Sequence, residues 1–265
     1  MEVTAIRLPR IEQENSLKAA MGQALSNQLR PQPGDILVVT SKVIAVDEGR
    51  VVNLASVRPN AHAVRLAQKA RLDPALVRVV MKEADKILGA VPGAVLTLKD
   101  GMFVANAGAD RSNAPEGHAV LWPANAWATA ERLRVWFEAL AGGPSGIVIA
   151  DSHCEPLRLG TSGVALACAG FLPVEDVRGQ ADLYGHEMRI TFRAVADAVA
   201  SAAVLQMGEV AESTPCAIVR GSGLPMLGRR LTAQERRSPN IAPDKDLFAP
   251  AYRHHVTHVA RRGAR

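Results

Sequence analysis

The sequence predicts a fold in which helices and strands are mixed along the chain, and two observations carry this prediction. Short apolar runs rich in Val and Ile have strand character, as in residues 35–46, 146–151 and 216–220. Longer segments such as residues 125–141 place apolar side chains every three or four positions, which is the period of an amphipathic helix. The chain has 265 residues, enough for one large domain or two small ones.

The first half of the chain alternates between helices and strands. Leu or Met recurs at every fourth position from Leu17 to Leu29, which predicts a helix that the proline-rich residues 30–34 end. Asp73 precedes Pro74, an arrangement that suits the N-cap and first turn of another helix. The predicted elements are a strand at 3–8, a helix at 12–29, a central strand at 35–46, helices at 59–71 and 73–85, and strands at 86–91, 94–98 and 102–105.

The second half follows the same mixed pattern. Asn125 is a suitable N-cap for the helix that ends at Ala141. Residues 142–146 (Gly-Gly-Pro-Ser-Gly) mark either a hinge between domains or a helix-to-strand connection. From Leu231 onward the sequence is polar and basic, which predicts an irregular peripheral end. The predicted elements are strands at 118–122, 146–151, 164–171 and 216–220, with helices at 125–141 and 191–207.

Composition and charge narrow the class of protein. Much of the formal charge of +5 lies in residues 253–265, which indicates a solvated end rather than a nucleic-acid site. The three cysteines lack zinc-site spacing, and an odd number without a secretion signal favours a reducing cytoplasm. No apolar run approaches the roughly 20 residues that span a bilayer. We therefore expect a cytoplasmic protein without nucleic-acid or membrane partners.

The stretch Val104–Asn113 ends a strand in a loop rich in Asn, Asp, Gly and Ser. Asp110 and Asn113 lie three residues apart there, so both could face one bound cation or phosphate. A second strand ends at Asp151, next to Ser152, and Glu209 follows a helix. Oxygen ligands of this kind suit Mg²⁺ or Mn²⁺. The alternative is that each acid only caps a helix or forms a turn.

Common phosphate-binding and nucleophile motifs are absent from the sequence. There is no G-x-x-x-x-G-K-[ST], no G-x-G-x-x-G opening a helix, and no G-x-S-x-G. Gly221-Ser-Gly223 is a weak signal. His153 and Cys154 are adjacent, and neighbouring side chains on extended backbone point to opposite sides, so a Cys/His nucleophile is disfavoured.

Taken in order, the motifs resemble the coenzyme F420-0:L-glutamate ligase family over roughly residues 3–222. The most specific are N-A-G-x-D-x-S-N at 106–113, D-L-Y-G-x-E at 182–187 and V-R-G at 219–221. The supporting stretches are Leu8–Ile11, Gly34–Lys42, Asp47–Arg50, Ile149–Ser152, Val195–Asp197 and Met207–Glu209.

The resemblance implies an α+β, family-specific mixed-sheet fold that forms an intertwined homodimer without a standard Walker or Rossmann nucleotide site. The ligase-like domain would span residues 1–223, with a subdivision near 142–146 as an alternative. Residues 224–265 would form a basic, irregular C-terminal tail.

The implied reaction uses GTP and Mg²⁺ or Mn²⁺, with K⁺ as a further candidate, to join L-glutamate to a carboxylate of a coenzyme F420 precursor through an acyl phosphate. No catalytic residue is assigned. Asp110 and Asp151 would hold one metal, and Ser152 and Glu209 a second. The implied GTP residues are Leu8, Pro9, Arg10, Ile11, Ser41, Lys42, Asn113, Met207, Gly208, Glu209, Val210, Ala211, Glu212, Ser213 and Thr214.

Two stretches depart from the family pattern. Val46 stands where the family has a lysine that would touch phosphate, and Lys42 is the candidate to replace it. Cys154 and Glu155 replace Gly-Arg after the second acid, and glutamate in place of arginine reverses the local charge. The alternatives are therefore the same ligase chemistry on a pterin or furan type of acceptor, or a catalytically silent nucleotide-binding relative. The sequence does not assign the acceptor, the number of glutamates, the preferred metal, or GTP against ATP.

Overall fold

The structure is a computed structural model that describes residues 1–12, 14, 16–242 and 245–251, so the basic residues 253–265 lie outside the description. The chain divides into two compact units, and each is described by itself. Unit 1 comprises Met1–Arg50 and Pro123–Pro239, and unit 2 comprises Val51–Trp122 together with the segment that begins at Asn240. Unit 2 is therefore inserted between two segments of unit 1.

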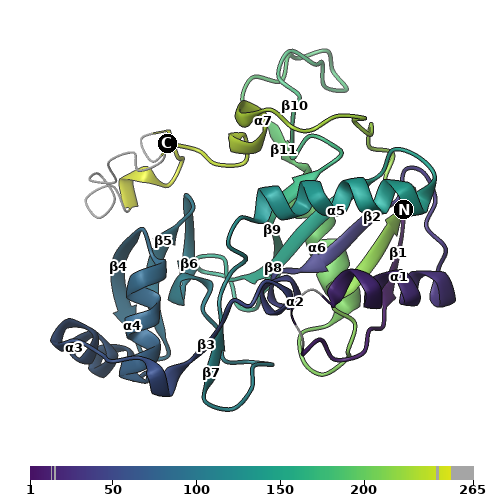
Figure 1. The fold of residues 1–265 in the computed structure, drawn as a ribbon. Coiled ribbons are helices and arrows are strands. Elements are labelled where there is room, and N and C mark those ends of the chain that lie inside the picture. Colours follow the sequence, from purple (N-terminus) through teal and green to yellow (C-terminus); the bar gives the residue numbers. More distant parts are fainter. Residues whose placement is uncertain (13, 15, 243–244, 252–265) are drawn as a thin grey trace. The chain divides into compact units, whose positions relative to one another are not determined.

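Unit 1 is built on an open sheet of five strands (Figure 1). Adjacent strands are antiparallel except for β2 and β8, which run parallel, so the sheet is mixed. The spatial order is β1 (Glu2–Ile6), β12 (Cys216–Arg220), β2 (Ile36–Thr40), β8 (Gly146–His153) and β9 (Ser162–Ala169). The α+β, mixed-sheet part of the predicted fold is confirmed.

Helices cover both faces of this sheet (Figure 1). Side chains alternate along β2, so that Leu37 and Val39 face one apolar core while Ile36 and Val38 face another. The first core is shared with α1 (Leu17–Gln28) and α5 (Ala126–Ala141), and the second with α6 (Val195–Met207). Burial of the central strands on both faces explains why they read as continuous apolar runs.

Unit 2 has its own apolar core, formed by two helices and short strands. The meander β4 (Lys86–Val91), β5 (Ala94–Lys99) and β6 (Met102–Ala105) is antiparallel. A separate pair joins β3 (Val51–Asn53) to β7 (His118–Val120). The helical elements are α3 (Ala61–Ala70), α4 (Pro74–Glu83) and the short 3-10 turns η1 (Leu54–Ser56) and η2 (Asn106–Gly108).

Most predicted elements are confirmed, including both predicted helix caps. Asp73 accepts a hydrogen bond from the Ala75 amide at 2.7 Å, with Pro74 opening α4. Asn125 accepts one from the Ala128 amide at 3.0 Å at the start of α5. These signals are reliable because the cap satisfies amides that have no partner within the helix.

The predicted strand at 35–46 is wrong in its second half. Strand β2 ends at Thr40, and residues Ser41–Asp47 form the helix α2. Ile44 and Ala45 are buried, and Ile44 joins the core between the sheet and α1. Packing of this apolar face outweighs the β-propensity of the Val and Ile residues in the run.

Other boundaries also differ from prediction, and the helix predicted at 12–29 begins only at Leu17. Strand β8 continues through Ser152 and His153, because these residues pair with Gly163 and Ser162 of β9. The helix predicted at 191–207 begins only at Val195, since β11 (Phe192–Ala194) pairs with the unpredicted strand β10 (Val174–Asp176). Beyond Leu231, which is buried, the segment expected to be irregular contains helix α7 (Ala233–Arg237) with a capping box between Thr232 and Glu235.

Residues 142–146 connect a helix to a strand. Gly142 ends α5 in the left-handed conformation, and Gly146 begins β8. The chain passes from one unit to the other elsewhere, after Arg50, Trp122 and Pro239. The ligase-like domain at 1–223, with a tail at 224–265, stays a prediction.

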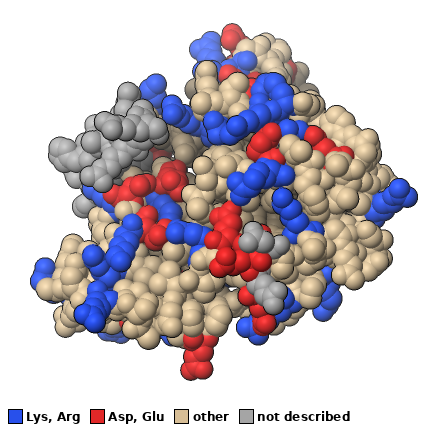
Figure 2. Space-filling view, viewed as in Figure 1, with Lys and Arg blue, Asp and Glu red and all other residues tan. Residues whose placement is uncertain are grey.

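No helix in the described part of the chain is both long and apolar enough to cross a membrane. On the face drawn in Figure 2, basic and acidic side chains are interspersed, and both signs of charge recur across it.

Candidate functional site

The predicted site residues of unit 1 gather at one edge of its five-stranded sheet. Strands β1, β2 and β8 run in the same direction and end at this edge, while β12 and β9 begin there. Two backbone hydrogen bonds join the segments, from the Leu8 amide to the Ser213 carbonyl at 3.0 Å and from the Thr40 amide to the Pro215 carbonyl at 2.9 Å. Ligands in open sheets commonly bind beyond the carboxyl ends of strands.

The end of β8 and the loop after α6 meet through side chains. The Ser152 hydroxyl lies 2.9 and 2.8 Å from the two carboxylate oxygens of Glu209. The Thr161 hydroxyl donates to Glu209 Oε1 at 3.2 Å. Asp151 Oδ1 accepts from the Ser152 amide at 2.9 Å. The Glu209 carboxylate and two hydroxyls are therefore close together on residues up to 57 positions apart in the sequence, and Asp151 is the chain neighbour of Ser152.

The loop from Met207 to Thr214 has a defined shape. Gly208 adopts a φ of 76°, and a Cβ there would collide with the Glu212 side chain. Glu212 accepts from the Val210 amide at 2.8 Å, and the Thr214 hydroxyl donates to the Met207 carbonyl at 2.6 Å. The loop exposes Glu209 while it keeps the side chain of Met207 in the core.

The other predicted nucleotide residues of unit 1 differ in exposure. Pro9 and Arg10 are exposed, Ile11 is half-buried, and Leu8 is buried. Ser41 and Lys42 form the first turn of α2 directly after β2, so both lie at the site edge of the sheet rather than within a strand. Ser41 is buried and Lys42 is half-buried.

Asp110 and Asn113 belong to unit 2, where they lie on a strained loop. Asn106, Ala107 and Gly108 all have positive φ, at 54°, 51° and 72°, and Asn113 also does at 53°. Such conformations disfavour side chains and persist only where surrounding contacts enforce them.

Hydrogen bonds from β5 and β6 hold this loop in place. Asn106 Oδ1 accepts from the Val95 amide at 2.9 Å. The Ala107 amide donates to the buried Thr97 hydroxyl at 3.0 Å, which itself donates to the Val104 carbonyl at 2.6 Å. Hydrogen bonds within the chain therefore define the backbone of this loop.

Gly108 in this loop has a steric reason to be glycine. A Cβ at this position would overlap the indole ring of Trp122, which is buried. Asp110 follows at the end of the turn, where its amide and carbonyl exchange hydrogen bonds with Val120 at 2.9 and 2.8 Å. Its carboxylate accepts from the amide and the hydroxyl of Ser112. Asp110 therefore stabilises the turn, which is the alternative to metal binding considered above.

Asp197 belongs to one of the supporting motif stretches, and its side chain contacts β9, the strand next to β8. Its Oδ1 accepts from the Ala165 amide at 2.9 Å, next to the extra residue Leu166 that makes a bulge in β9. Burial raises the pKa of the Asp197 carboxyl, and the charge of Glu155 adds to this, while the Ala165 bond and His153 oppose it. Thr161, which contacts Glu209, and Asp197 were not among the predicted site residues, because nothing in the local sequence indicates either contact.

The two departures from the family pattern lie in different settings. Cys154 and Glu155 are exposed on the connection that leaves β8. Val46 is half-buried in α2, where its carbonyl accepts from the Gly49 amide at 3.0 Å. Cys168 and Cys216 are buried, and burial raises the pKa of both thiols, that of Cys216 to about 12.

The donor set fits a hard divalent cation in its chemistry, since carboxylate and hydroxyl oxygens are the ligands that Mg²⁺ and Mn²⁺ prefer. Among the described residues, no group of three or more His, Cys, Asp or Glu side chains is arranged so that it could hold a metal ion. Unit 1 supplies Asp151, Ser152 and Glu209 to the predicted set, and unit 2 supplies Asp110.

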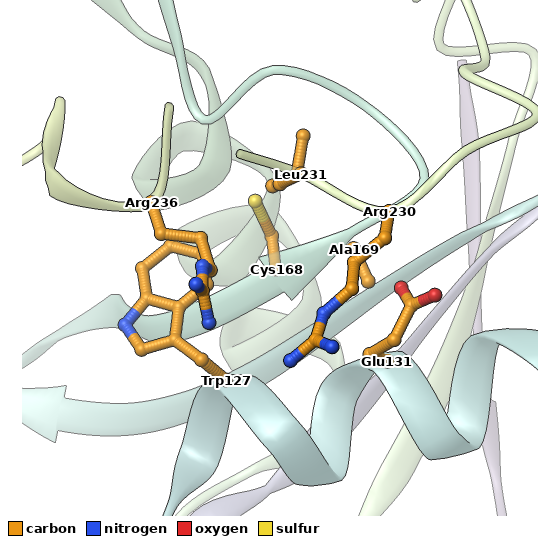
Figure 3. A pocket seen from close by; sticks show the side chains of 7 residues that line it. All are labelled: Trp127, Glu131, Cys168, Ala169, Arg230, Leu231 and Arg236. Carbon is orange, nitrogen blue, oxygen red and sulfur yellow. The ribbon is translucent and has the colours of Figure 1, made fainter. Parts of the chain in front are cut away.

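A small cavity lies at the opposite edge of the unit 1 sheet, where β9 ends (Figure 3). Its volume of about 10 Å³ is what one water molecule requires. Arg236 Nε is buried without a hydrogen-bond partner among the described atoms, which a water could supply. This cavity is too small for a nucleotide. The residues that line it are Trp127, Glu131, Cys168, Ala169, Arg230, Leu231 and Arg236.

Comparison with known proteins places this geometry in context. The family model described as F420-0:Gamma-glutamyl ligase matches residues 5–221. The coenzyme F420:L-glutamate ligase of Methanopyrus kandleri is 35% identical over 229 residues, which cover 86% of this chain and 90% of that protein. The enzymes of the same name from Methanocaldococcus jannaschii and Archaeoglobus fulgidus are 37% and 34% identical, covering 73% and 81% of this chain and 78% and 84% of their own.

Proposed function

The chain belongs to the F420-0:gamma-glutamyl ligase family, and from that premise we propose that it is a GTP- and divalent-metal-dependent ligase that adds L-glutamate to a coenzyme F420 precursor. The observation that carries this proposal is the contact between Ser152, the neighbour of Asp151 in the chain, and Glu209 at the edge where β2 and β8 end. That edge also gathers the backbone segments 8–11 and 207–214.

The proposed reaction has two steps, phosphorylation of a carboxylate and then formation of an amide. A carboxylate oxygen of the precursor attacks the γ-phosphorus of GTP, so that GDP leaves and an acyl phosphate forms. The α-amine of L-glutamate then attacks the acyl carbon, inorganic phosphate leaves, and the amine loses a proton as the amide forms. The bound divalent metal would neutralise charge on the phosphate oxygens.

The chain's own residues bind and orient the reactants. Asp110 and Asp151 would hold one metal, and Ser152 and Glu209 the other. The exposed loop 207–214, Arg10 and the half-buried Lys42 would line the nucleotide, and Leu8 and Met207 would contribute only backbone because their side chains are buried. Donors that are already ordered stabilise a transferring phosphoryl group without reorganisation at the moment of reaction.

The test is calorimetry with GTP, with and without Mn²⁺, paired with release of phosphate in the presence of F420-0 and L-glutamate. We expect GTP binding that depends on Mn²⁺ and phosphate release that depends on both acceptors. Binding without phosphate release would instead support the catalytically silent relative, for which Val46 is the motivating residue. Absence of metal-dependent binding would refute the proposal.

A changed acceptor is the second candidate, favoured by Glu155. This carboxylate is exposed just after the end of β8 that would hold the metal, where it would repel an anionic acceptor that an arginine would attract. Phosphate release with pterin or furan acceptors but not with F420-0 would select this candidate. Glu155→Arg should then shift the preference towards F420-0.

We also propose that the protein acts as a homodimer. The connection between β10 and β11 carries Leu183, Tyr184 and Ile190, whose side chains are more than four-fifths exposed in the single chain, at 101%, 88% and 86%. Exposed apolar side chains in this number favour a protein partner. Light scattering after size-exclusion chromatography should give twice the mass of 28.2 kDa, and Leu183→Asp should reduce it.

A further inference from the structure

The loop between β8 and β9 in unit 1, residues 154–161, starts and ends at the candidate site. At its base, His153 of β8 pairs with Ser162 of β9. Thr161, the last residue of the loop, donates a hydrogen bond to Glu209 Oε1 at 3.2 Å. We call residues 154–161 the β8–β9 loop. Any ligand that this loop contacts therefore lies next to the edge of the sheet where the metal and the nucleotide are proposed to bind.

Two leucines of the β8–β9 loop have no packing role in the folded chain. Leu157 and Leu159 are fully exposed, at 105% and 107%. An apolar side chain that stays in water contributes no burial free energy to folding. Single exposed apolar side chains are common on protein surfaces. Here two such side chains lie within three residues of each other, on a loop that is bonded to the candidate site.

The backbone at Leu157 adds a second unusual feature. The Arg158 amide donates to the Glu155 carbonyl at 3.2 Å, which closes a turn with Pro156 and Leu157 at its centre. Leu157 has a φ of 60° at the third position of this turn, where positive φ normally requires Gly or Asn. Positive φ is disfavoured for a leucine, and strain of this kind clusters at ligand sites. Neither packing nor turn chemistry accounts for a leucine at this position.

The apolar pair, rather than charge, distinguishes the ligand that this loop suits. Glu155 and Arg158 are both exposed on the same turn, and their opposite charges favour neither anions nor cations. Small-molecule sites are lined mainly by apolar side chains, with a few polar groups that fix orientation. The acceptors considered above, a coenzyme F420 precursor or a pterin or furan compound, share a heteroaromatic ring. A ring of this kind has the apolar faces that two exposed leucines can cover.

We propose that Leu157 and Leu159 are specificity-determining residues that contact the heteroaromatic ring of the acceptor, and this inference rests on the function proposed above. Leu157 lies five residues after Ser152, so the two are at most about 18 Å apart even in a fully extended chain. One acceptor molecule can therefore reach from these leucines to the metal end of β8. Burial of the leucines against the ring offsets the strain at Leu157, and it is expected to affect acceptor binding but not GTP binding.

The first experiment is calorimetry with F420-0 in the absence of GTP, so that no turnover is required. Leu157→Asn combined with Leu159→Ser should raise the Kd for F420-0 roughly 10-fold, because each leucine loses part of its transfer free energy. Leu205→Gln is the control, since Leu205 is an 81% exposed leucine on α6, and it should leave this Kd unchanged. The Kd for GTP with Mn²⁺ should stay the same in all variants. An equal Kd for F420-0 in the unmodified protein and the double variant would overturn the inference.

The second experiment separates ligand binding from a structural role of Leu157. Asn adopts positive φ more readily than leucine, so Leu157→Asn alone relieves backbone strain. We expect a higher midpoint of chemical denaturation together with weaker F420-0 binding. A lower midpoint would mean that Leu157 supports the fold, and it would contradict the inference.

The outcomes also separate this inference from the proposed function. Weaker F420-0 binding in the double variant of a protein that releases no phosphate would support the ring contact while the proposed function fails. Phosphate release with an unchanged KM for F420-0 in the double variant would leave the proposed function intact and refute the ring contact. Where F420-0 does not bind, a pterin and a furan carboxylate replace it, and absence of binding by all three also refutes the contact.

A second copy of the chain is the competing occupant of the β8–β9 loop. Light scattering after size-exclusion chromatography of the double variant tests this alternative. A reduced mass together with unchanged F420-0 affinity would assign Leu157 and Leu159 to an interface between copies, against the inference. An unchanged mass together with weaker F420-0 binding would support the contact with the acceptor ring.

Discussion

The loop at 106–113 in unit 2 and the cluster of Asp151, Ser152 and Glu209 in unit 1 each present side-chain oxygens, and they do so for different reasons. The loop is local: its shape comes from four residues with positive φ and from bonds to β5 and β6 no more than 11 residues away. The cluster is non-local, since Ser152 and Glu209 are 57 residues apart and meet only through their side chains. The loop is rigid by backbone geometry, whereas the cluster depends on where α6 and β8 end.

The largest expected effect tests whether the two regions act on one ligand. Asp110→Asn and Asp151→Asn should each weaken Mn²⁺-dependent GTP binding by more than about 100-fold, because each removes a charged ligand from the metal. Calorimetry checks this, with Asp35→Asn as the control in unit 1. Unchanged binding in either variant would separate that region from the site.

The rigidity of the loop predicts the next effect. Gly108→Ala forces a Cβ into the Trp122 ring and should destabilise unit 2 by roughly 2–4 kcal/mol, from overpacking together with backbone strain. Gly117→Ala is the matched control, since Gly117 has the same φ of 72° and open space around its Cβ position. Chemical denaturation of the two variants separates the clash from the strain. Equal losses would mean that Trp122 is not the reason for the glycine.

The side-chain contacts of the cluster predict a smaller effect. Ser152→Ala removes a hydroxyl that Glu209 contacts through both carboxylate oxygens, and it should weaken Mn²⁺ binding about 10-fold. Thr161→Val, which removes the single longer bond at 3.2 Å, should cost less. Titration with Mn²⁺ at saturating GTP compares the Mn²⁺ affinities of the two variants. The reverse order would place the metal nearer Thr161 than Ser152.

The smallest expected effect concerns Asp197, whose carboxylate accepts a hydrogen bond from the Ala165 amide. Burial raises the pKa of the Asp197 carboxyl in the folded state above its ordinary value of 3.8. The contribution of the protonated carboxyl to folding stability is therefore fully present at lower pH, and it is lost as the pH rises through the raised pKa. Asp197→Asn keeps an acceptor for the Ala165 amide and cannot ionise. Denaturation at acidic and neutral pH should therefore show a relative gain for this variant at neutral pH. A relative loss there would mean that the ionised carboxylate is needed.

Several residues of the candidate site stand out in the local sequence, whereas others depend on contacts that no local pattern carries. The loop at 106–113 stands out because turn residues follow a strand, and Asp151 stands out because an acid follows an apolar run, although β8 continues to His153. Thr161 and Asp197 were missed, since their partners lie 48 and 32 residues away. The hydrogen bond from Thr129 to Glu48 was not predicted for the same reason, because the two residues are 81 positions apart.

The sequence by itself determined the identity of most elements, the capped starts of α4 and α5, and the residue types available for binding a cation, because these follow from local periodicity, caps and turn chemistry. Tertiary structure alone decided that residues 41–47 form a helix, that Ser152 meets Glu209, and that the Thr129 hydroxyl donates a hydrogen bond to Glu48. Packing decided the first, because the buried face of Ile44 and Ala45 outweighs β-propensity. Strand order decided the others, because it brings distant chain ends to one edge of the sheet.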